Sequence, residues 1–308
     1  MKKTITLALL TALSFTGFAQ EDEESQGSVI QTYTPSKLLK KGQWDIKFFN
    51  SIYTQTEQTD GGSESQKIAR QSFFTNTTEI FTGVSDNARV NVGLIFQIRS
   101  NTLGGQSVFE VFDFKDNGND RRSGLTTLAP SIRVQPFRDV PNFSFTSSFY
   151  IPVFKDKADT VADGINSYLD FRSYAWETKF FYDKTFGGNN WQLFTEIDFK
   201  YNFGEKSSEA SANENRTERF ANNSLGVPLS AFLSYFPSSK STVFINTQQV
   251  FLVDLGNDFA QNSTAFGFGG KYQLTDVLNV EASFNKIVRG HNFQGLGQTF
   301  SLGLRALF

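Results

Sequence analysis

Apolar and polar residues alternate along most of the chain after about residue 42. In RVNVGLIFQIR, residues 89–99, the even-numbered positions between the two arginines are all apolar. In NWQLFTEIDFKYNF, residues 190–203, the odd-numbered positions carry apolar or aromatic side chains apart from one threonine. Successive side chains of a strand point to opposite faces, whereas a helix would repeat about every 3.6 residues. The chain is therefore predicted to be all-β.

The same pattern predicts twelve strands, with ten or fourteen as the alternatives. Their ranges are about 42–54, 70–83, 88–101, 124–137, 142–154, 170–185, 190–204, 223–236, 241–254, 263–273, 277–289 and 297–308. Connections after the even-numbered strands are short, such as VSDN at 84–87. Those after the odd-numbered strands are mostly longer and hydrophilic, such as residues 55–69 and 205–222. An antiparallel meander gives this alternation when its two ends face different surroundings.

The sorting of loops by length favours a transmembrane antiparallel up-and-down β-barrel. Outer-membrane barrels have short periplasmic turns and long extracellular loops. A secreted or periplasmic β-sandwich also has alternating strands, but nothing sorts its loops in this way. Beyond residue 20 no apolar stretch is long enough for a membrane helix, whereas a barrel strand needs only alternate apolar positions.

The first nineteen residues have the pattern of a secretory signal peptide. MKKTITLALLTALSFTGFA places two lysines before an apolar run and ends on Gly17-Phe18-Ala19. The apolar run is too short for a membrane anchor. Residues 20–41 are then predicted to be a periplasmic leader, or a plug that folds into the periplasmic mouth, and residues 42–308 form the barrel.

The chain ends on QTFSLGLRALF, in which alternate residues are apolar. Those on one face are Phe300, Leu302, Leu304, Ala306 and Phe308. A terminal Phe after such alternation resembles the C-terminal signature by which bacterial outer-membrane proteins are recognised for insertion. The resemblance implies that the five residues are a signal for the barrel-assembly machinery and that the protein lies in the outer membrane of a Gram-negative bacterium. TPSKLLKKGQWDIKFFNSIYTQT, residues 34–56, also resembles uncharacterised outer-membrane transporter and porin-type barrels.

Charged residues gather on the more polar faces of the strands, as expected for a wet lumen within lipid. The pore-lining candidates are Asp45, Lys47, Glu79, Arg89, Arg99, Arg133, Glu177, Lys179, Glu196, Asp198, Lys200, Glu281 and Arg305. Seven are basic and six are acidic, so the lumen lacks the single sign of charge that would imply ion selectivity. A transverse field across the pore and a network of ion pairs that partly fills it both fit these residues. The strand at 241–254 has apolar residues on both faces, so its orientation stays open.

A barrel of twelve strands should enclose a narrow or plugged pore, because eight strands are nearly filled by side chains and sixteen leave a broad channel. The function predicted from this size is an outer-membrane channel or transporter for a small solute. The alternative is a non-conducting structural or accessory barrel that binds other outer-membrane machinery. The expected partners are outer-membrane lipid, the barrel-assembly machinery, a small-molecule solute and, for the alternative, an envelope protein.

The residue content gives little support to an enzyme, a cofactor site or a metal centre. There is no cysteine, and the only histidine is His291 in the segment GHNFQG, which lacks the pattern of the twelve-stranded outer-membrane phospholipases. Asp113, Asp116 and Asp120 surround a DNGND loop, but their spacing differs from that of an EF-hand and is typical of a turn. The net charge of −2 gives no basic surface for nucleic acid.

Overall fold

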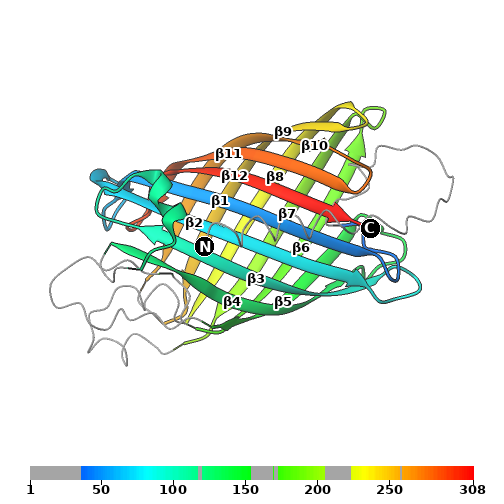
Figure 1. The fold of residues 1–308 in the computed structure, drawn as a ribbon, viewed down its shortest axis with the longest axis horizontal. Coiled ribbons are helices and arrows are strands. Elements are labelled where there is room, and N and C mark those ends of the chain that lie inside the picture. The colour runs from blue at the N-terminus through cyan, green and yellow to red at the C-terminus, as the bar shows by residue number, and fades with distance from the viewer. Residues whose placement is uncertain (1–35, 117–119, 154–168, 170–172, 205–222, 257–258) are drawn as a thin grey trace.

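The computed structural model describes residues 36–116, 120–153, 169, 173–204, 223–256 and 259–308. These residues form one closed barrel of twelve antiparallel strands (Figure 1). The strands are β1 (Trp44–Thr59), β2 (Ser65–Gly83), β3 (Val90–Thr102), β4 (Arg121–Val134), β5 (Phe143–Pro152), β6 (Ala175–Phe186), β7 (Trp191–Asn202), β8 (Ser224–Ser238), β9 (Ser241–Asp254), β10 (Gln261–Gln273), β11 (Leu278–His291) and β12 (Gln298–Leu307). A 3-10 helix, η2 (Val108–Asp113), lies between β3 and β4. The predicted fold class and strand number are confirmed.

The barrel closes where the first strand meets the last. β1 and β12 are paired from Asp45 opposite Leu307 to Thr54 opposite Gln298. The chain end is held as well, because Trp44 N donates to Phe308 O at 2.6 Å and Phe308 N donates to Trp44 O at 3.0 Å. The apolar C-terminal residue is thus part of the sheet, and closure leaves no unpaired edge.

The first hairpin differs from the prediction. β1 continues to Thr59 and β2 begins at Ser65, so only residues 60–64 remain of the connection expected at 55–69. That connection is shorter than the one at 135–142 on the opposite end, and the predicted alternation of short and long connections is therefore wrong at this point. The added end of β1 is polar on both faces, and the added end of β2 is polar apart from Ile68 and Ala69, so neither shows the alternation that marks a strand in the sequence.

Aromatic side chains form two girdles on the outside of the barrel. One lies at the end that carries the connections 84–89, 135–142, 187–190, 239–240 and 274–277, here called the turn end. The girdle at the turn end consists of Trp44, Tyr182, Trp191, Tyr235 and Tyr272. The girdle at the opposite end, here called the loop end, consists of Phe149, Tyr174, Trp176, Phe203 and Phe251. All ten side chains are between 38% and 55% exposed. Such girdles flank the apolar band of transmembrane barrels.

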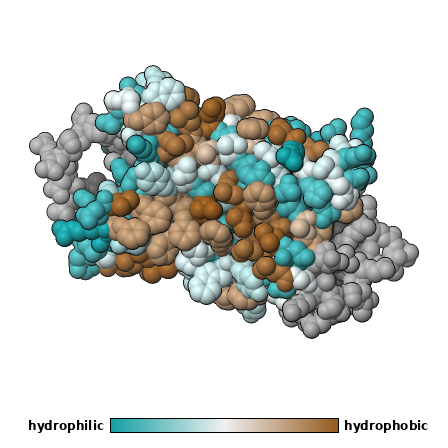
Figure 2. Space-filling view, turned by 180° about the vertical axis from the view of Figure 1, so that it is seen from behind, coloured by the Kyte–Doolittle hydropathy of each residue, from teal (hydrophilic) through white to brown (hydrophobic). Residues whose placement is uncertain are grey.

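Hydrophobic side chains gather in broad patches on the face of the barrel wall seen in Figure 2. The exposed hydrophobic side chains of the barrel include Phe300, Leu302 and Leu304 of β12, between 37% and 53% exposed, which face outward as the alternation predicts. Their proposed recognition by the assembly machinery stays a prediction. None of the helices in the described part of the chain is long and apolar enough to cross a membrane.

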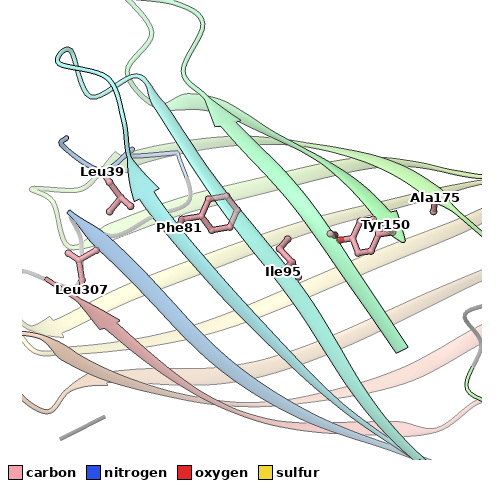
Figure 3. Close-up of a cluster of buried hydrophobic side chains, with 7 residues drawn as sticks. Leu39, Phe81, Ile95, Tyr150, Ala175 and Leu307 are labelled. Atoms are coloured by element: carbon pink, nitrogen blue, oxygen red, sulfur yellow. The ribbon is translucent and has the colours of Figure 1, made fainter. Parts of the chain in front are cut away.

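A sparse apolar cluster lies on the inside of the wall. It consists of Leu39, Phe81, Ile95, Ala129, Tyr150, Ala175 and Leu307 (Figure 3). Most other buried side chains are polar or charged. The barrel is therefore stabilised by the hydrogen bonds of its closed sheet and by polar contacts in the lumen more than by a hydrophobic core.

Candidate functional site in the barrel lumen

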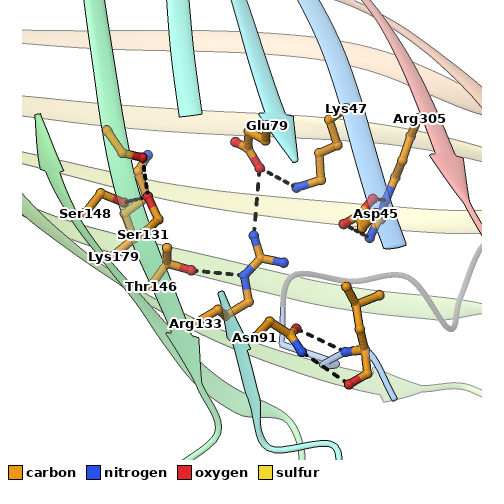
Figure 4. A network of polar contacts seen from close by, with 12 residues as sticks. Asp45, Lys47, Glu79, Asn91, Ser131, Arg133, Thr146, Ser148, Lys179 and Arg305 are labelled. Carbon is orange, nitrogen blue, oxygen red and sulfur yellow. Dashed lines mark hydrogen bonds and ion pairs between the residues drawn. The ribbon is translucent and has the colours of Figure 1, made fainter. Parts of the chain in front are cut away.

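Three of the predicted residues form a linked set of ion pairs on β1, β2 and β4. Lys47 Nζ lies 3.0 Å from Glu79 Oε2, and the Arg133 guanidinium lies 3.8 Å from the same oxygen (Figure 4). Lys47 and Glu79 are direct cross-strand partners, an arrangement that favours opposite charges. Arg133 also donates from Nε to Thr146 Oγ1 at 3.0 Å and lies 4.4 Å over the ring of Phe81.

A further pair spans the seam between β1 and β12. Arg305 Nε and one terminal nitrogen donate to the two carboxylate oxygens of Asp45 at 2.7 and 2.8 Å. Asp45 is only 1% exposed. A two-pronged guanidinium–carboxylate contact is the strong form of ion pair, and a buried carboxylate needs such a partner. We call Asp45, Lys47, Glu79, Arg133 and Arg305 the charged wall.

The second group of predicted residues surrounds one ammonium on β6 and β7. Lys179 Nζ lies 3.2 Å from Asp198, 3.4 Å from Glu196 and 4.0 Å from Glu177. The hydroxyl of Tyr150 donates to Glu177 at 2.5 Å. The predicted residues are thus joined into ion-pair networks, the second of the two arrangements that fit the sequence.

Other contacts involve residues that the alternation did not single out. Glu281 pairs with Lys271 of β10 at 3.0 Å. Lys200 places its ammonium 4.7 Å from the centre of the Tyr150 ring. Neither Lys271 nor Tyr150 was a candidate, since Lys271 stands in a glycine-rich strand and Tyr150 reads as an apolar residue.

The remaining predicted arginines are Arg99 and Arg89. Arg99 donates from a terminal nitrogen to the carbonyl of Leu169 at 2.9 Å, and Leu169 is 1% exposed. Arg89 lies in the turn before β3, where its backbone NH donates to Ser85 Oγ at 2.8 Å.

A row of phenylalanines forms the opposite side of the lumen. We call Phe181, Phe194, Phe232 and Phe244, from β6, β7, β8 and β9, the aromatic wall. Neighbouring ring centres are 6.1, 5.8 and 5.7 Å apart, the spacing of favourable ring contacts. The orientation of β9, which the sequence left open, follows from Phe244. Its adjacent residues Val243 and Ile245 are 50% and 61% exposed on the outside, so Phe244 faces the lumen.

Glycines opposite the lumen rings keep those rings against the sheet. The cross-strand pairs are Phe49 with Gly303, Phe81 with Gly93 and Phe244 with Gly269. A Cβ atom added at each glycine would lie 2.6, 2.5 and 2.5 Å from its partner ring. The glycines therefore let bulky rings lie flat over the neighbouring strand, and the space in front of them stays open.

A cavity of about 400 Å³ lies between the two walls, toward the turn end. Its apolar lining includes Phe49, Phe194, Phe232, Phe236 and Phe244. Its charged lining is Lys47, Glu79, Glu196, Lys271, Glu281 and Arg305, three of each sign. The volume is within the range of small-molecule sites, roughly 300–1,000 Å³.

The start of the described chain contacts the lumen at the turn end. Leu39 N donates to Asn91 Oδ1 at 3.1 Å, and Asn91 Nδ2 donates to Leu39 O at 3.2 Å. Leu39 is 5% exposed and Asn91 is fully buried. A Cβ at Gly83 would lie 2.1 Å from the carbonyl oxygen of Lys40, so glycine is required for this close approach. The predicted signal peptide and residues 20–35 lie outside the described residues.

The side chains weighed for metal or catalytic chemistry make ordinary contacts. Asp113 and Asp116 pair with Arg121 and Arg122 at 3.1 and 3.6 Å. His291 Nδ1 lies 3.2 Å from the hydroxyl of Ser63. In the described ranges no three His, Asp or Glu side chains gather as a metal site would require.

Comparison with solved structures identifies the fold. The COG4313 outer membrane channel from Pseudomonas putida F1 superposes with a TM-score of 0.61 and 10% identity, over 94% of this chain and 100% of the channel. This chain has the fold of an outer-membrane β-barrel. The apolar outer belt and this fold agree with the predicted place in the Gram-negative outer membrane.

Other solved barrels are less similar. The β domain of the Bordetella autotransporter BrkA gives a TM-score of 0.49 and 11% identity, over 85% of this chain and 98% of that domain. The NanC porin gives 0.44 and 7%, over 85% and 98%. Neither protein-family models nor curated protein sequences gave a match.

Proposed function

We propose that this protein is an outer-membrane channel through which a small solute diffuses. The observation that carries the proposal is the cavity of about 400 Å³ inside the barrel, lined by equal numbers of acidic and basic side chains. A barrel built only to be filled would use such space for packed side chains. The likeness in fold to an outer-membrane channel supports the same conclusion.

The paired charges define how the channel treats ions. Each cation of the charged wall lies beside a carboxylate, so neither sign dominates the path. Ion-selective pores are built instead from rings of one sign. The channel is therefore weakly ion-selective and of low conductance, since the paired side chains narrow the lumen.

The segment from Ser36 to Gly42 narrows the turn-end mouth in this proposal. The two hydrogen bonds between Leu39 and Asn91 fix this segment against the inner wall. Such an attachment favours the plug over a free leader.

The test is the conductance of the mature protein in a planar lipid bilayer, beside a Glu79→Gln variant and one lacking residues 20–38. Neutralising Glu79 frees Lys47 and Arg133 and should turn weak selectivity into preference for anions. The deletion should raise the conductance. Asp86→Asn is the matched control, since Asp86 pairs with Lys41 at a position where the aspartate side chain is 88% exposed.

Stable current steps whose selectivity moves in Glu79→Gln and not in Asp86→Asn would support the channel. Protein that is inserted and folded but silent in every form would contradict it. That result would favour the non-conducting accessory barrel, and capture of envelope partners would be the next step. Unchanged conductance after the deletion would refute the plug alone.

A further inference from the structure

The cavity between the two walls has a chemical character that narrows the class of solute. We propose that it binds a small zwitterion that carries a flat aromatic ring, as an aromatic amino acid does. The inference rests on the proposed channel function, because it names the solute class for the same lumen.

The aromatic wall supplies the surface for the ring. Phe194, Phe232 and Phe244 line the cavity and contact one another in sequence across three strands. Water makes few favourable interactions with such an apolar wall. A flat ring that replaces the water is stabilised by burial of its apolar surface and by contacts with the phenylalanine rings. The wall therefore favours a planar apolar group over a fully hydrated ion.

The charged side chains that line the cavity supply both signs of charge, Lys47 and Glu79 from the charged wall and Lys271 and Glu281 from β10 and β11. The side chains of Lys47 and Glu79 are 23% and 26% exposed, and those of Lys271 and Glu281 are 39% and 26% exposed. Their charged ends remain within reach of a solute while each pair stays intact. The ammonium of the solute can approach the glutamate of a pair while the carboxylate of the solute approaches the lysine of the same pair. A solute of one sign would satisfy only half of each pair and would repel the other half.

The glycine opposite Phe49 preserves the room for such a solute. At Gly303 the contacts that an added Cβ would make under 3.4 Å are with the ring of Phe49, at 2.6 and 3.0 Å. The ring is at the end of a side chain and can turn, so an alanine there should push it into the cavity. Gly303→Ala thus fills the site without changing a charge.

The first experiment measures binding independently of conduction. Radiolabelled L-tryptophan is equilibrated with the detergent-purified full barrel, and 3-indolepropionate, tryptamine and L-cyclohexylalanine compete for the site. They lack the ammonium, the carboxylate and the aromatic ring in turn. We expect each to compete about 3- to 10-fold less well than unlabelled tryptophan, in line with the loss of one favourable contact.

Three variants locate the site. Phe232→Leu and Gly303→Ala should weaken tryptophan binding about 3- to 10-fold, whereas Phe268→Leu, on a side chain 61% exposed on the outside, should not. The heat-dependent migration of each variant on gels confirms that it is folded. Gly303→Ala and Phe232→Leu act on opposite sides of the cavity, so a folding defect in one leaves the other informative.

Bilayer recordings then separate this inference from the channel itself. Tryptophan should interrupt the current of the unaltered barrel and interrupt that of Gly303→Ala less. Conduction without any tryptophan binding would overturn the solute class and leave the channel standing. Tryptophan binding in a barrel that never conducts would support the site and overturn the channel. Competition by 3-indolepropionate and tryptamine as strong as that by unlabelled tryptophan would also overturn the zwitterion.

Discussion

The charged wall and the aromatic wall face the same cavity but depend on different physics. In the charged wall each group is held at hydrogen-bonding distance, as in the 2.7 Å contact between Arg305 and Asp45. The rings of the aromatic wall sit 5.7 to 6.1 Å apart and interact through broad surfaces. A charged side chain that loses its partner is left with an uncompensated charge, whereas a ring that loses a neighbour loses only part of its contact area.

This contrast teaches that the two walls have separate tasks. The charged wall links β1, β2, β4 and β12 and so fixes the shape of the lumen around the closing seam. The aromatic wall is held by ring contacts and, in the proposed channel, is the surface that a solute ring would contact. Substitutions in the charged wall should therefore change stability most, and those that touch the rings should change transport most.

The largest effect on stability is expected from Arg305→Met. Removing the guanidinium leaves Asp45 buried without its partner, and breaking one side of a buried pair costs about 3 kcal/mol or more in the free energy of unfolding. Urea unfolding of the barrel in lipid vesicles measures the loss. The double variant Asp45→Asn, Arg305→Met should recover most of it, and failure to recover would show that the guanidinium acts by packing and not by charge.

The next effect is expected from Gly303→Ala, which presses on Phe49. Overfilling a tight site costs about 1–3 kcal/mol, and the displaced ring should also lower the single-channel conductance. Both quantities are measured on the same preparation. Gly226→Ala is the control, because there an added Cβ would meet nothing closer than 3.7 Å. If the two variants conducted equally, Phe49 would not narrow the path.

A loss of stability similar to that of Gly303→Ala is expected from Asn91→Ala at the turn end. Leu39 would lose both hydrogen bonds to the side chain, at a cost of about 1 kcal/mol for each. Release of the segment should also raise the conductance toward that of the protein lacking residues 20–38. A conductance that falls or stays constant would contradict the role of Leu39 in the mouth.

The smallest effect is expected from Lys41→Ala, which removes the exposed pair with Asp86. The lysine side chain is 62% exposed, and pairs in such positions contribute about 0–1 kcal/mol. The unfolding midpoint should stay within measurement error of the unaltered barrel. A loss equal to that of Arg305→Met would remove the distinction between lumen pairs and surface pairs.

Much of the fold could be predicted because the alternation of apolar and polar residues along a strand shows which face contacts lipid. Residues 89–99 and 190–203 gave strand ranges within a few residues of β3 and β7. The extension of β1 to Thr59 escaped notice because both of its faces are polar there. Physically, a strand that leaves the apolar layer loses the contrast on which the prediction depends.

The site was predicted unevenly for a related reason. A charged side chain in an alternating strand is expected to face the lumen, because facing lipid is costly. Lys47 and Glu79 could therefore be assigned to the lumen from sequence alone. A phenylalanine gives no such direction, because it fits lipid as well as a lumen wall. Phe194 stood on the polar face of its strand, but only its contacts with Phe181 and Phe232 show a continuous wall. The glycines that accommodate the rings depend on register, which the sequence does not supply.

The pair of Asp45 and Arg305 has a consequence for the order of assembly. Its members are 260 positions apart in the chain, so the contact can form only when the last strand has reached the first. Contacts of such long range are slow to form, because the intervening chain must first be arranged. Until then Asp45 lacks the guanidinium of Arg305 and the sheet has two open edges, which are costly in hydrocarbon. The pair thus makes stability conditional on a complete chain, and a barrel that lacks its final strand should be left open to degradation.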